Sequence, residues 1–196
     1  MILCDHHIEK ALRDGNLAID PLPESGQLQS SSLDLRVGDD FRIWNPALKA
    51  PATAHSIDLD NVEISEILDL TRPLALNPQG LIAIDPGAFV LVRTLEHVHL
   101  PIRSKLAARV EGRSRQARLG MGVHITAPTI HAGFSGKITL EIINHGVFRL
   151  EIRPNVSKLC QLIIEKVSAI PKRGGSASFT GQSTVLGTPR GRQQRR

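Results

Sequence analysis

One carboxylate stands inside an apolar segment of the chain. Glu141 lies between Leu140 and Ile142 in the run GKITLEIIN. An ionised side chain among aliphatic residues costs free energy unless the protein uses it, and burial raises the pKa of a carboxyl group. A carboxyl group with a raised pKa takes up and releases a proton near neutral pH. Two interpretations follow: Glu141 is a general acid–base, or it pairs with an arginine to hold strands or subunits together.

A second polar cluster lies in the run EGRSRQARLG, residues 111–120, which combines Arg113, Ser114 and Arg118. The planar guanidinium group binds phosphate oxygens in pairs, and the hydroxyl group and the backbone amides of a turn add further donors. This composition favours binding of a phosphorylated small molecule. The run lacks the Gly-Lys-Ser/Thr end of a Walker loop. The alternative interpretation is an ordinary basic surface loop.

Cysteine and histidine form no familiar metal-binding pattern. Cys4 and Cys160 are the only cysteines and lie far apart in the sequence, so we predict two reduced, buried thiols. His6 and His7 are adjacent, and on a helix they are expected to point apart. The zinc-deaminase pattern, His-x-Glu with a downstream Cys-x-x-Cys, is absent. We therefore expect structural or surface histidines and no metal site.

Short segments with regular turn signals must position these residues. A helix is predicted over 5–14, with Asp5 able to cap its N-terminus and Gly15 able to end it. Two strands around a turn at Gly38-Asp39 are predicted over 31–43. A turn of helix is predicted near 61–68. Further strands are predicted over 88–100, 105–110, 123–127, 136–144, 148–152 and 159–167. A turn is predicted at His131-Ala132-Gly133. Such a chain is typical of a mainly all-β barrel or sandwich.

Composition limits the classes of function. A length of 196 residues predicts one domain over 1–170, followed by an arm and basic tail over 171–196. The tail carries four of the arginines behind the net charge of +5 and is expected to be a solvated end. Only 3% of residues are aromatic, which argues against stacking on nucleic-acid bases. No apolar run is long enough to span a bilayer, and no signal-peptide core is evident. We expect a cytoplasmic protein.

Several runs, in order, resemble the dCTP deaminases of the dUTPase-like superfamily. They are ILCDHHIEKAL, GNLAID and SSSLDLRVGDDFRI, then VEGRSRQARLG, VHITA and GFSGKITLEIIN, and finally LEIRPNVSKLCQL and FTGQ. The resemblance covers Met1 to about Gln182. It implies a distorted β-barrel of the dUTPase-like type with a short N-terminal helix and a flexible C-terminal arm. It also implies a homotrimer with each site at a subunit interface.

The resemblance implies zinc-independent hydrolysis of dCTP to dUTP and ammonia, in pyrimidine deoxynucleotide synthesis. Glu141 matches the family's catalytic glutamate, and Ser114 and Arg118 match residues that orient the water. Mg²⁺ would accompany the triphosphate, and dTTP is a further expected ligand. The implied nucleotide contacts are Arg113, Ser114, Arg115, Gln116, Ala117, Arg118, Thr126, Ala127, His131, Thr139, Leu140, Glu141, Gln161, Phe179 and Gln182.

Some positions depart from the family pattern. The family usually has Asp-Pro-Gly where this chain has His131-Ala132-Gly133, and Lys-Tyr where it has Ser178-Phe179. The family also has Ser-Leu where this chain has Arg115-Gln116, and Arg115 is a candidate replacement for the missing lysine. Two alternatives stay open: a bifunctional enzyme that converts dCTP to dUMP, against which His131 argues, and a catalytically weak nucleotide-binding regulatory relative.

Overall fold

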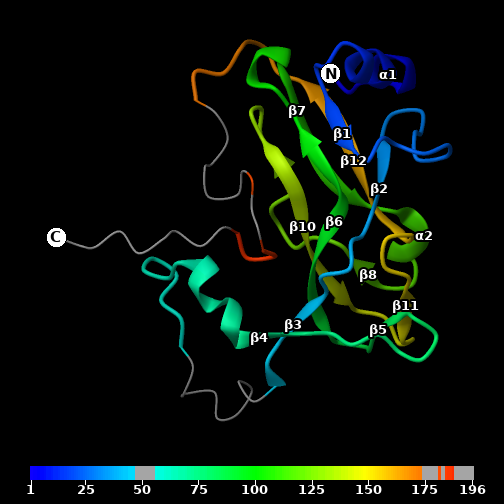
Figure 1. Ribbon diagram of the computed structural model, residues 1–196, viewed down its shortest axis with the longest axis vertical. Coiled ribbons are helices and arrows are strands. Elements are labelled where there is room, and N and C mark those ends of the chain that lie inside the picture. The colour runs from blue at the N-terminus through cyan, green and yellow to red at the C-terminus, as the bar shows by residue number, and fades with distance from the viewer. Residues whose placement is uncertain (47–55, 174–180, 182–183, 188–196) are drawn as a thin grey trace.

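A computed structural model describes residues 1–46, 56–173, 181 and 184–187 (Figure 1). The described helical elements are α1 (Asp5–Arg13), η2 (Ile64–Leu70), η3 (Ile102–Ser104) and α2 (Ser114–Ala117). None of the described helices has the length and apolar character needed to cross a membrane. The strands are β1 (Ala18–Asp20), β2 (Leu33–Arg36), β3 (Arg42–Trp44), β4 (Thr71–Pro73), β5 (Ile82–Ile84), β6 (Phe89–His99), β7 (Leu106–Gly112), β8 (Met121–Gly122), β9 (Thr129–Ile130), β10 (Ser135–Asn144), β11 (Leu150–Ile152) and β12 (Lys158–Lys166).

The strands form two main sheets and one small sheet. The first has the order β4-β3-β6-β10-β8, with β1 also paired to β6, and the second has the order β2-β12-β7-β9. The third joins β11 to β5. Every named strand pair is antiparallel. The mainly all-β prediction is therefore confirmed, with separate sheets rather than one continuous closed barrel over the described residues.

An aliphatic core lies between these sheets. Along β10 the burial alternates strictly, so that Ile138, Leu140 and Ile142 are buried, whereas Thr139 and Glu141 are half-buried. Full burial of one such aliphatic side chain contributes about 1.5–3 kcal/mol to stability. The alternation fixes the register of β10, because a slip by one residue would place Glu141 in the core.

A buried ion pair connects the two main sheets. Glu96 of β6 is fully buried, and its carboxylate accepts hydrogen bonds from the Arg36 backbone N–H and from Arg36 Nε, both at 2.8 Å. The side-chain amide of Gln27 donates to the same carboxylate at 2.9 Å. Because both carboxylate oxygens have donors, the cost of burying the charge is offset locally. This network holds β2 against β6.

The predicted segments agree with most of the observed elements. The N-terminal helix, the long strands β6, β10 and β12, and the turn at Ala132-Gly133 are confirmed, and the helical turn predicted near 61–68 is η2. The two strands predicted over 31–43 exist, but they join different sheets as β2 and β3.

The strand predicted over 123–127 is wrong. These residues connect β8 of the first sheet to β9 of the second. A segment that crosses between two sheets cannot continue either ladder of hydrogen bonds. Val123 is buried and Val110 donates its N–H to the carbonyl of Pro128 at 2.9 Å, which anchors both ends of this crossing segment.

Candidate functional site

A pocket of about 550 Å³ lies beside α2, where β7 ends. The start of α2 and the ends of β2, β7 and β12 therefore contribute to one concave surface. We call it the α2 pocket, and its lining residues are Gln29, Ser30, Ser31, Ser32, Asp34, Glu111, Gly112, Arg113, Ser114, Ala117 and Gln161.

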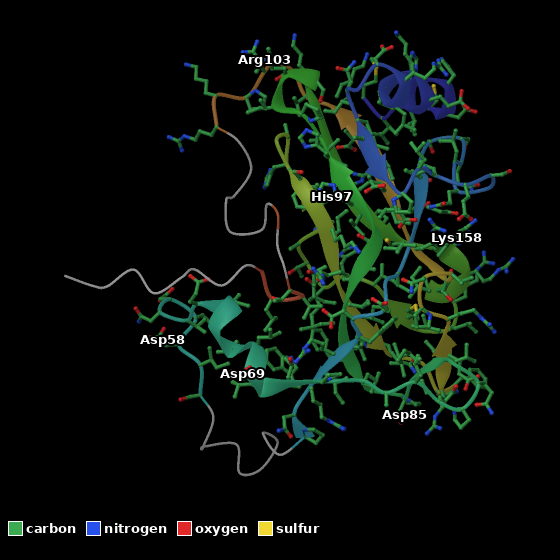
Figure 2. The ribbon with its side chains drawn as sticks, viewed as in Figure 1. Asp58, Asp69, Asp85, His97, Arg103 and Lys158 are labelled. Carbon is green, nitrogen blue, oxygen red and sulfur yellow. The ribbon has the colours of Figure 1, made fainter. Side chains whose placement is uncertain are left out.

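Arg113 is held in a fixed direction at the entry to α2. Its backbone is extended (φ −95°, ψ 135°), and its Nη2 lies 3.2 Å from Asp34 Oδ2. Its Nη1 donates a hydrogen bond to the carbonyl of Lys158 at 3.2 Å. Lys158 lies on the same side of the molecule as α2 (Figure 2). Arg113 and Lys158 thus place positive charge at one end of the sheet formed by β2, β12 and β7.

Asp34 is a site residue that the sequence analysis did not single out. Its side chain is almost completely buried in β2. Burial raises the pKa of this carboxyl group, and the positive charges of Arg113 and Lys158 and a hydrogen bond from Gln29 partly oppose that shift. The available signal was an acidic residue between two leucines in the run SSLDLR, a weaker form of the conflict that identified Glu141.

Gln161 of β12 also lies in the α2 pocket, opposite Glu111 of β7 in the strand register. Its Oε1 accepts a hydrogen bond from Ser32 Oγ at 3.2 Å, and its Nε2 donates to the Gly112 carbonyl at 3.1 Å. These two contacts fix which end of the amide faces which neighbour. The structure therefore brings together Arg113, Ser114 and Gln161 around one pocket.

A second pocket of about 580 Å³ lies on the other side of Arg113 and is formed chiefly by β11, β12 and the end of α2. The side-chain N–H of Gln116 donates a hydrogen bond to the Lys158 carbonyl at 3.3 Å. The side chains of Arg113 and Gln116 therefore both point at β12. Arg113 is shared by the two pockets. A bound anion at this position would therefore be accessible from either side.

Glu141 occupies a separate wall, on the half-buried face of β10. Burial raises the pKa of its carboxyl group, and a hydrogen bond from the Ile125 backbone N–H and the nearby His124 ring partly oppose that shift. Within the described residues, Glu141 forms no ion pair with an arginine. The environment therefore fits a proton-transfer group better than a structural ion pair in the same chain.

His124 connects this wall to the α2 pocket. Its Nε2 lies 3.8 Å from Glu111 Oε2, and Glu111 lines the α2 pocket. Glu141 itself lines neither of the two pockets. The crossing segment 123–128 that carries His124 also exposes Thr126 and Ala127. Glu141 and Ser114 thus lie on different walls and share neither of these two pockets in one chain.

The remaining predicted residues divide into three groups. Ser114, Arg115, Ala117, Arg118 and His131 are exposed. The side chain of Leu140 is fully buried in the core, which leaves its backbone to line a site. Phe179 and Gln182 lie outside the described residues.

A piece of the predicted arm covers the face that carries Glu141. Val185 and Leu186 are buried and pack with Leu91, which lies opposite Glu141 in the register of β6 and β10. Thr139 Oγ1 donates to the Val185 carbonyl at 3.1 Å. Opposite residues of an antiparallel pair share a face. Residues 184–187 therefore dock beside the candidate acid–base.

The fold is mainly all-β, and the comparisons assign the family of the chain. A solved 2'-deoxycytidine 5'-triphosphate deaminase from Agrobacterium tumefaciens superposes with a TM-score of 0.61 at 22% identity, over 85% of this chain and 48% of that one. The family described as dCTP deaminase-like matches residues 2–167, so the chain belongs to that family. The match with the solved chain shows a shared fold, and this chain spans about half of its length.

Curated relatives match over most of the chain. A "dCTP deaminase, dUMP-forming" from Methanobrevibacter smithii is 37% identical over 168 residues, 85% of this chain and 81% of the relative. A "dCTP deaminase" from Psychromonas ingrahamii is 36% identical over 173 residues, 86% and 85% of the two chains. A third, from Rhodospirillum rubrum, is 33% identical over 93% of this chain and 91% of its own.

Proposed function

We propose that the protein is a dCTP deaminase, which hydrolyses dCTP to dUTP and ammonia. The observation that carries the proposal is Glu141, a half-buried carboxyl group with a raised pKa, in a chain of the dCTP deaminase-like family. Deamination needs one group that first accepts a proton and then donates it. A carboxyl group whose pKa is moved toward neutrality suits both steps.

The reaction proceeds by addition of water to C4 of the cytosine ring. Glu141 takes a proton from the attacking water, whose oxygen bonds to C4, and delivers it to the ring nitrogen N3. Glu141 then takes the proton of the new C4 hydroxyl group and passes it to the C4 amino group, so that the C4–N bond breaks, the C4=O bond forms and ammonia departs. Ser114 and Arg118 orient the water by hydrogen bonds, and the backbone of Thr126 and Ala127 recognises the edge of the cytosine base.

The triphosphate binds at the entry to α2. Arg113 supplies a guanidinium group, and Lys158 adds positive charge from β12. Because Asp34 holds Arg113 at 3.2 Å, the donor is already oriented before the nucleotide arrives, which lowers the entropy cost of binding. Mg²⁺ enters as part of the substrate, bound to phosphate oxygens and water.

Each complete site contains residues of two copies of the chain in a homotrimer. Two observations support this part of the proposal. Ser114 and Arg118 are exposed in one chain while Glu141 lies on a different wall. Large apolar side chains near both walls are also exposed, namely Leu119 (46%) and Ile125 (57%), as expected of surfaces that a neighbouring copy covers. We place the protein in the cytoplasm, in keeping with its unpaired Cys4 and Cys160.

A second candidate activity is further hydrolysis of dUTP to dUMP and pyrophosphate. The name of the Methanobrevibacter smithii relative favours it. His131 opposes it, because an imidazole nitrogen replaces the carboxylate that would activate water for attack on phosphorus. The exposed position of His131 in the turn before β10 leaves it free to contact the sugar.

Product analysis separates these activities. Purified protein is incubated with dCTP and Mg²⁺, and the nucleotides are resolved by chromatography. Release of dUTP and ammonia in equal amounts supports the proposal, and dUMP with pyrophosphate supports the second candidate. Bound but unchanged dCTP would leave only the nucleotide-binding regulatory relative and would refute both activities.

A further inference from the structure

The first turn of α1 contains a cluster that the mechanism does not use. Cys4 is the N-cap residue of α1, and its Sγ lies 3.3 Å from His6 Nδ1 and 3.1 Å from His7 Nδ1. The expectation that His6 and His7 point apart is therefore wrong: their ring centroids are 4.1 Å apart. Both rings converge on one sulfur atom.

The position of Cys4 explains this convergence. Side chains in a helix lean toward its N-terminus, over the preceding turn. Cys4 precedes the first turn with an extended backbone (φ −88°, ψ 172°), so its thiol lies where the side chains of the first turn lean. Two adjacent residues can then reach the same atom, although their Cα–Cβ bonds diverge.

The spacing suits a tetrahedral metal ion. Zinc binds thiolate sulfur at about 2.3 Å and imidazole nitrogen at about 2.0–2.1 Å, which places S and N about 3.6 Å apart at the tetrahedral angle. The observed S···N distances of 3.3 and 3.1 Å are shorter than that value by about half an ångström or less. All three ligand atoms lie within 4.8 Å of one another, and the described residues contain no other such group of three. Small rotations of the exposed rings supply the difference.

The surroundings favour a cation as well. Asp5 Oδ1 lies 3.4 Å from His6 Nδ1 and adds negative charge beside the cluster. The Cys4 side chain makes no capping hydrogen bond at the N-terminus of α1, so the thiol has no competing capping role there. Both histidines are exposed, which leaves room for water as the fourth ligand.

We infer that Cys4, His6 and His7 form a binding site for a soft or borderline divalent transition metal, with Zn²⁺ as its natural occupant. One thiolate and two imidazoles are a ligand set that zinc, cobalt and copper accept and that magnesium and calcium do not. The site is separate from the deaminase chemistry, because none of its three residues lines the α2 pocket or its neighbour. The bound ion stabilises α1. The backbone N–H of Asp5 in α1 donates a hydrogen bond to the carbonyl of Ser30 at 3.0 Å, and Ser30 lines the α2 pocket.

Metal titration of the full chain tests the inference. The purified protein is stripped with a chelator, and Zn²⁺ is titrated in competition with a chromophoric chelator. The expected result is one Zn²⁺ per chain. Titration with Co²⁺ is expected to give a thiolate-to-cobalt charge-transfer absorption band. Zn²⁺ is also expected to protect Cys4 from a thiol reagent, whereas burial raises the pKa of the Cys160 thiol and keeps it unreactive throughout.

Single substitutions identify the ligands. Cys4→Ser, His6→Asn and His7→Asn are each expected to weaken Zn²⁺ binding at least about tenfold, by loss of one of three protein ligands. Serine is a favourable N-cap residue, so Cys4→Ser preserves the helix, and thermal unfolding without metal verifies this. His145→Asn, at an exposed histidine after β10, is the matched control and is expected to bind as the wild type does.

Two results would overturn the metal site. One is absence of stoichiometric Zn²⁺ binding to the wild type. The other is unchanged affinity in Cys4→Ser with loss in the histidine variants, which would mean adventitious binding to a surface histidine pair. Neither result depends on deaminase activity, so the proposed function is tested independently.

Discussion

At the residue scale, Glu141 has the environment that proton transfer requires. It is half-buried on β10, and burial raises the pKa of its carboxyl group. Glu141→Gln keeps the shape and removes the proton-transfer group. We expect kcat for dCTP to fall by at least about 10²-fold, the typical contribution of a general acid–base, while the Kd for dCTP changes little. Steady-state rates with dCTP and calorimetric binding measure the two effects, and normal turnover by this variant would refute the assignment.

The raised pKa of Glu141 also has a thermodynamic consequence. A folded-state pKa above the unfolded value means that the folded chain binds more protons between the two values, so stability falls as pH rises through this window. Below the pKa that Glu141 has in the unfolded chain, near pH 4, the contribution of Glu141 to the free energy of unfolding is fully retained. Glu141→Gln is therefore expected to match the wild type near pH 4 and to be more stable at pH 7.5. Urea unfolding at both pH values measures this, and a variant less stable at pH 7.5 would contradict it.

Substitution of Arg113 is expected to weaken nucleotide binding. It is oriented by Asp34 and by the Lys158 carbonyl, and a charge-assisted hydrogen bond contributes about 1.5–3 kcal/mol. Arg113→Gln is expected to raise KM for dCTP at least about tenfold, with a smaller change in kcat. Arg103→Gln is the matched control, because Arg103 (labelled in Figure 2) lies on η3 before β7, whereas Arg113 follows the other end of β7. Equal effects of the two substitutions would exclude a specific role for Arg113.

At the element scale, the C-terminal segment and β10 act together. Val185 and Leu186 bury their side chains against Leu91, and Thr139 holds the Val185 carbonyl. Leu186→Ser removes apolar contacts that contribute about 1.5–3 kcal/mol and is expected to release the segment. Trypsin cleavage after Lys172 and Arg173, followed by mass spectrometry, is then expected to be faster than in the wild type. Unchanged cleavage would show that this docking does not hold the arm.

The crossing segment 123–128 is the other element that builds the site. It is held by burial of Val123 and by a hydrogen bond from the Val110 N–H of β7 to the Pro128 carbonyl, and it brings the Ile125 N–H to Glu141. Because it links the two main sheets, it places His124 between Glu141 and Glu111. The site thus depends on how the sheets meet rather than on one strand.

At the scale of the whole molecule, Glu141 and Ser114 lie on separate walls of one chain. This separation predicts that copies of the chain assemble to complete each site. A homotrimer would have a mass of about 64 kDa, three times the 21.4 kDa chain, and light scattering measures it. In a cyclic trimer each contact between copies is heterologous. A site that takes Glu141 from one copy and Ser114 from the next is therefore open to complementation.

Mixing two inactive variants tests this division. Glu141→Gln and Ser114→Ala chains are denatured together, refolded and assayed. If each site uses two copies, about one quarter of the sites in a random one-to-one mixture combine an intact Glu141 with an intact Ser114. Activity near one quarter of the wild-type value is expected, against the near-zero value of either variant alone. A mixture as inactive as its components would place both residues in the same chain's site.

The sequence by itself determined the local features of this protein. The alternation along GKITLEIIN sets the register of β10 and leaves Glu141 half-buried, because side chains of a strand alternate between faces. The helix α1, the long strands and the cluster at the start of α2 follow from equally local signals. The ordered motifs also identified the dCTP deaminase-like family.

Only the tertiary structure decided what depends on separate segments meeting. The sequence did not reveal that Asp34 orients Arg113, or that residues 123–128 cross between sheets and do not form a strand. It also failed to show that His6 and His7 converge on Cys4. In each case the deciding contact joins groups whose approach is set by how a helix end or a sheet edge is positioned, and no periodicity along the chain encodes that position.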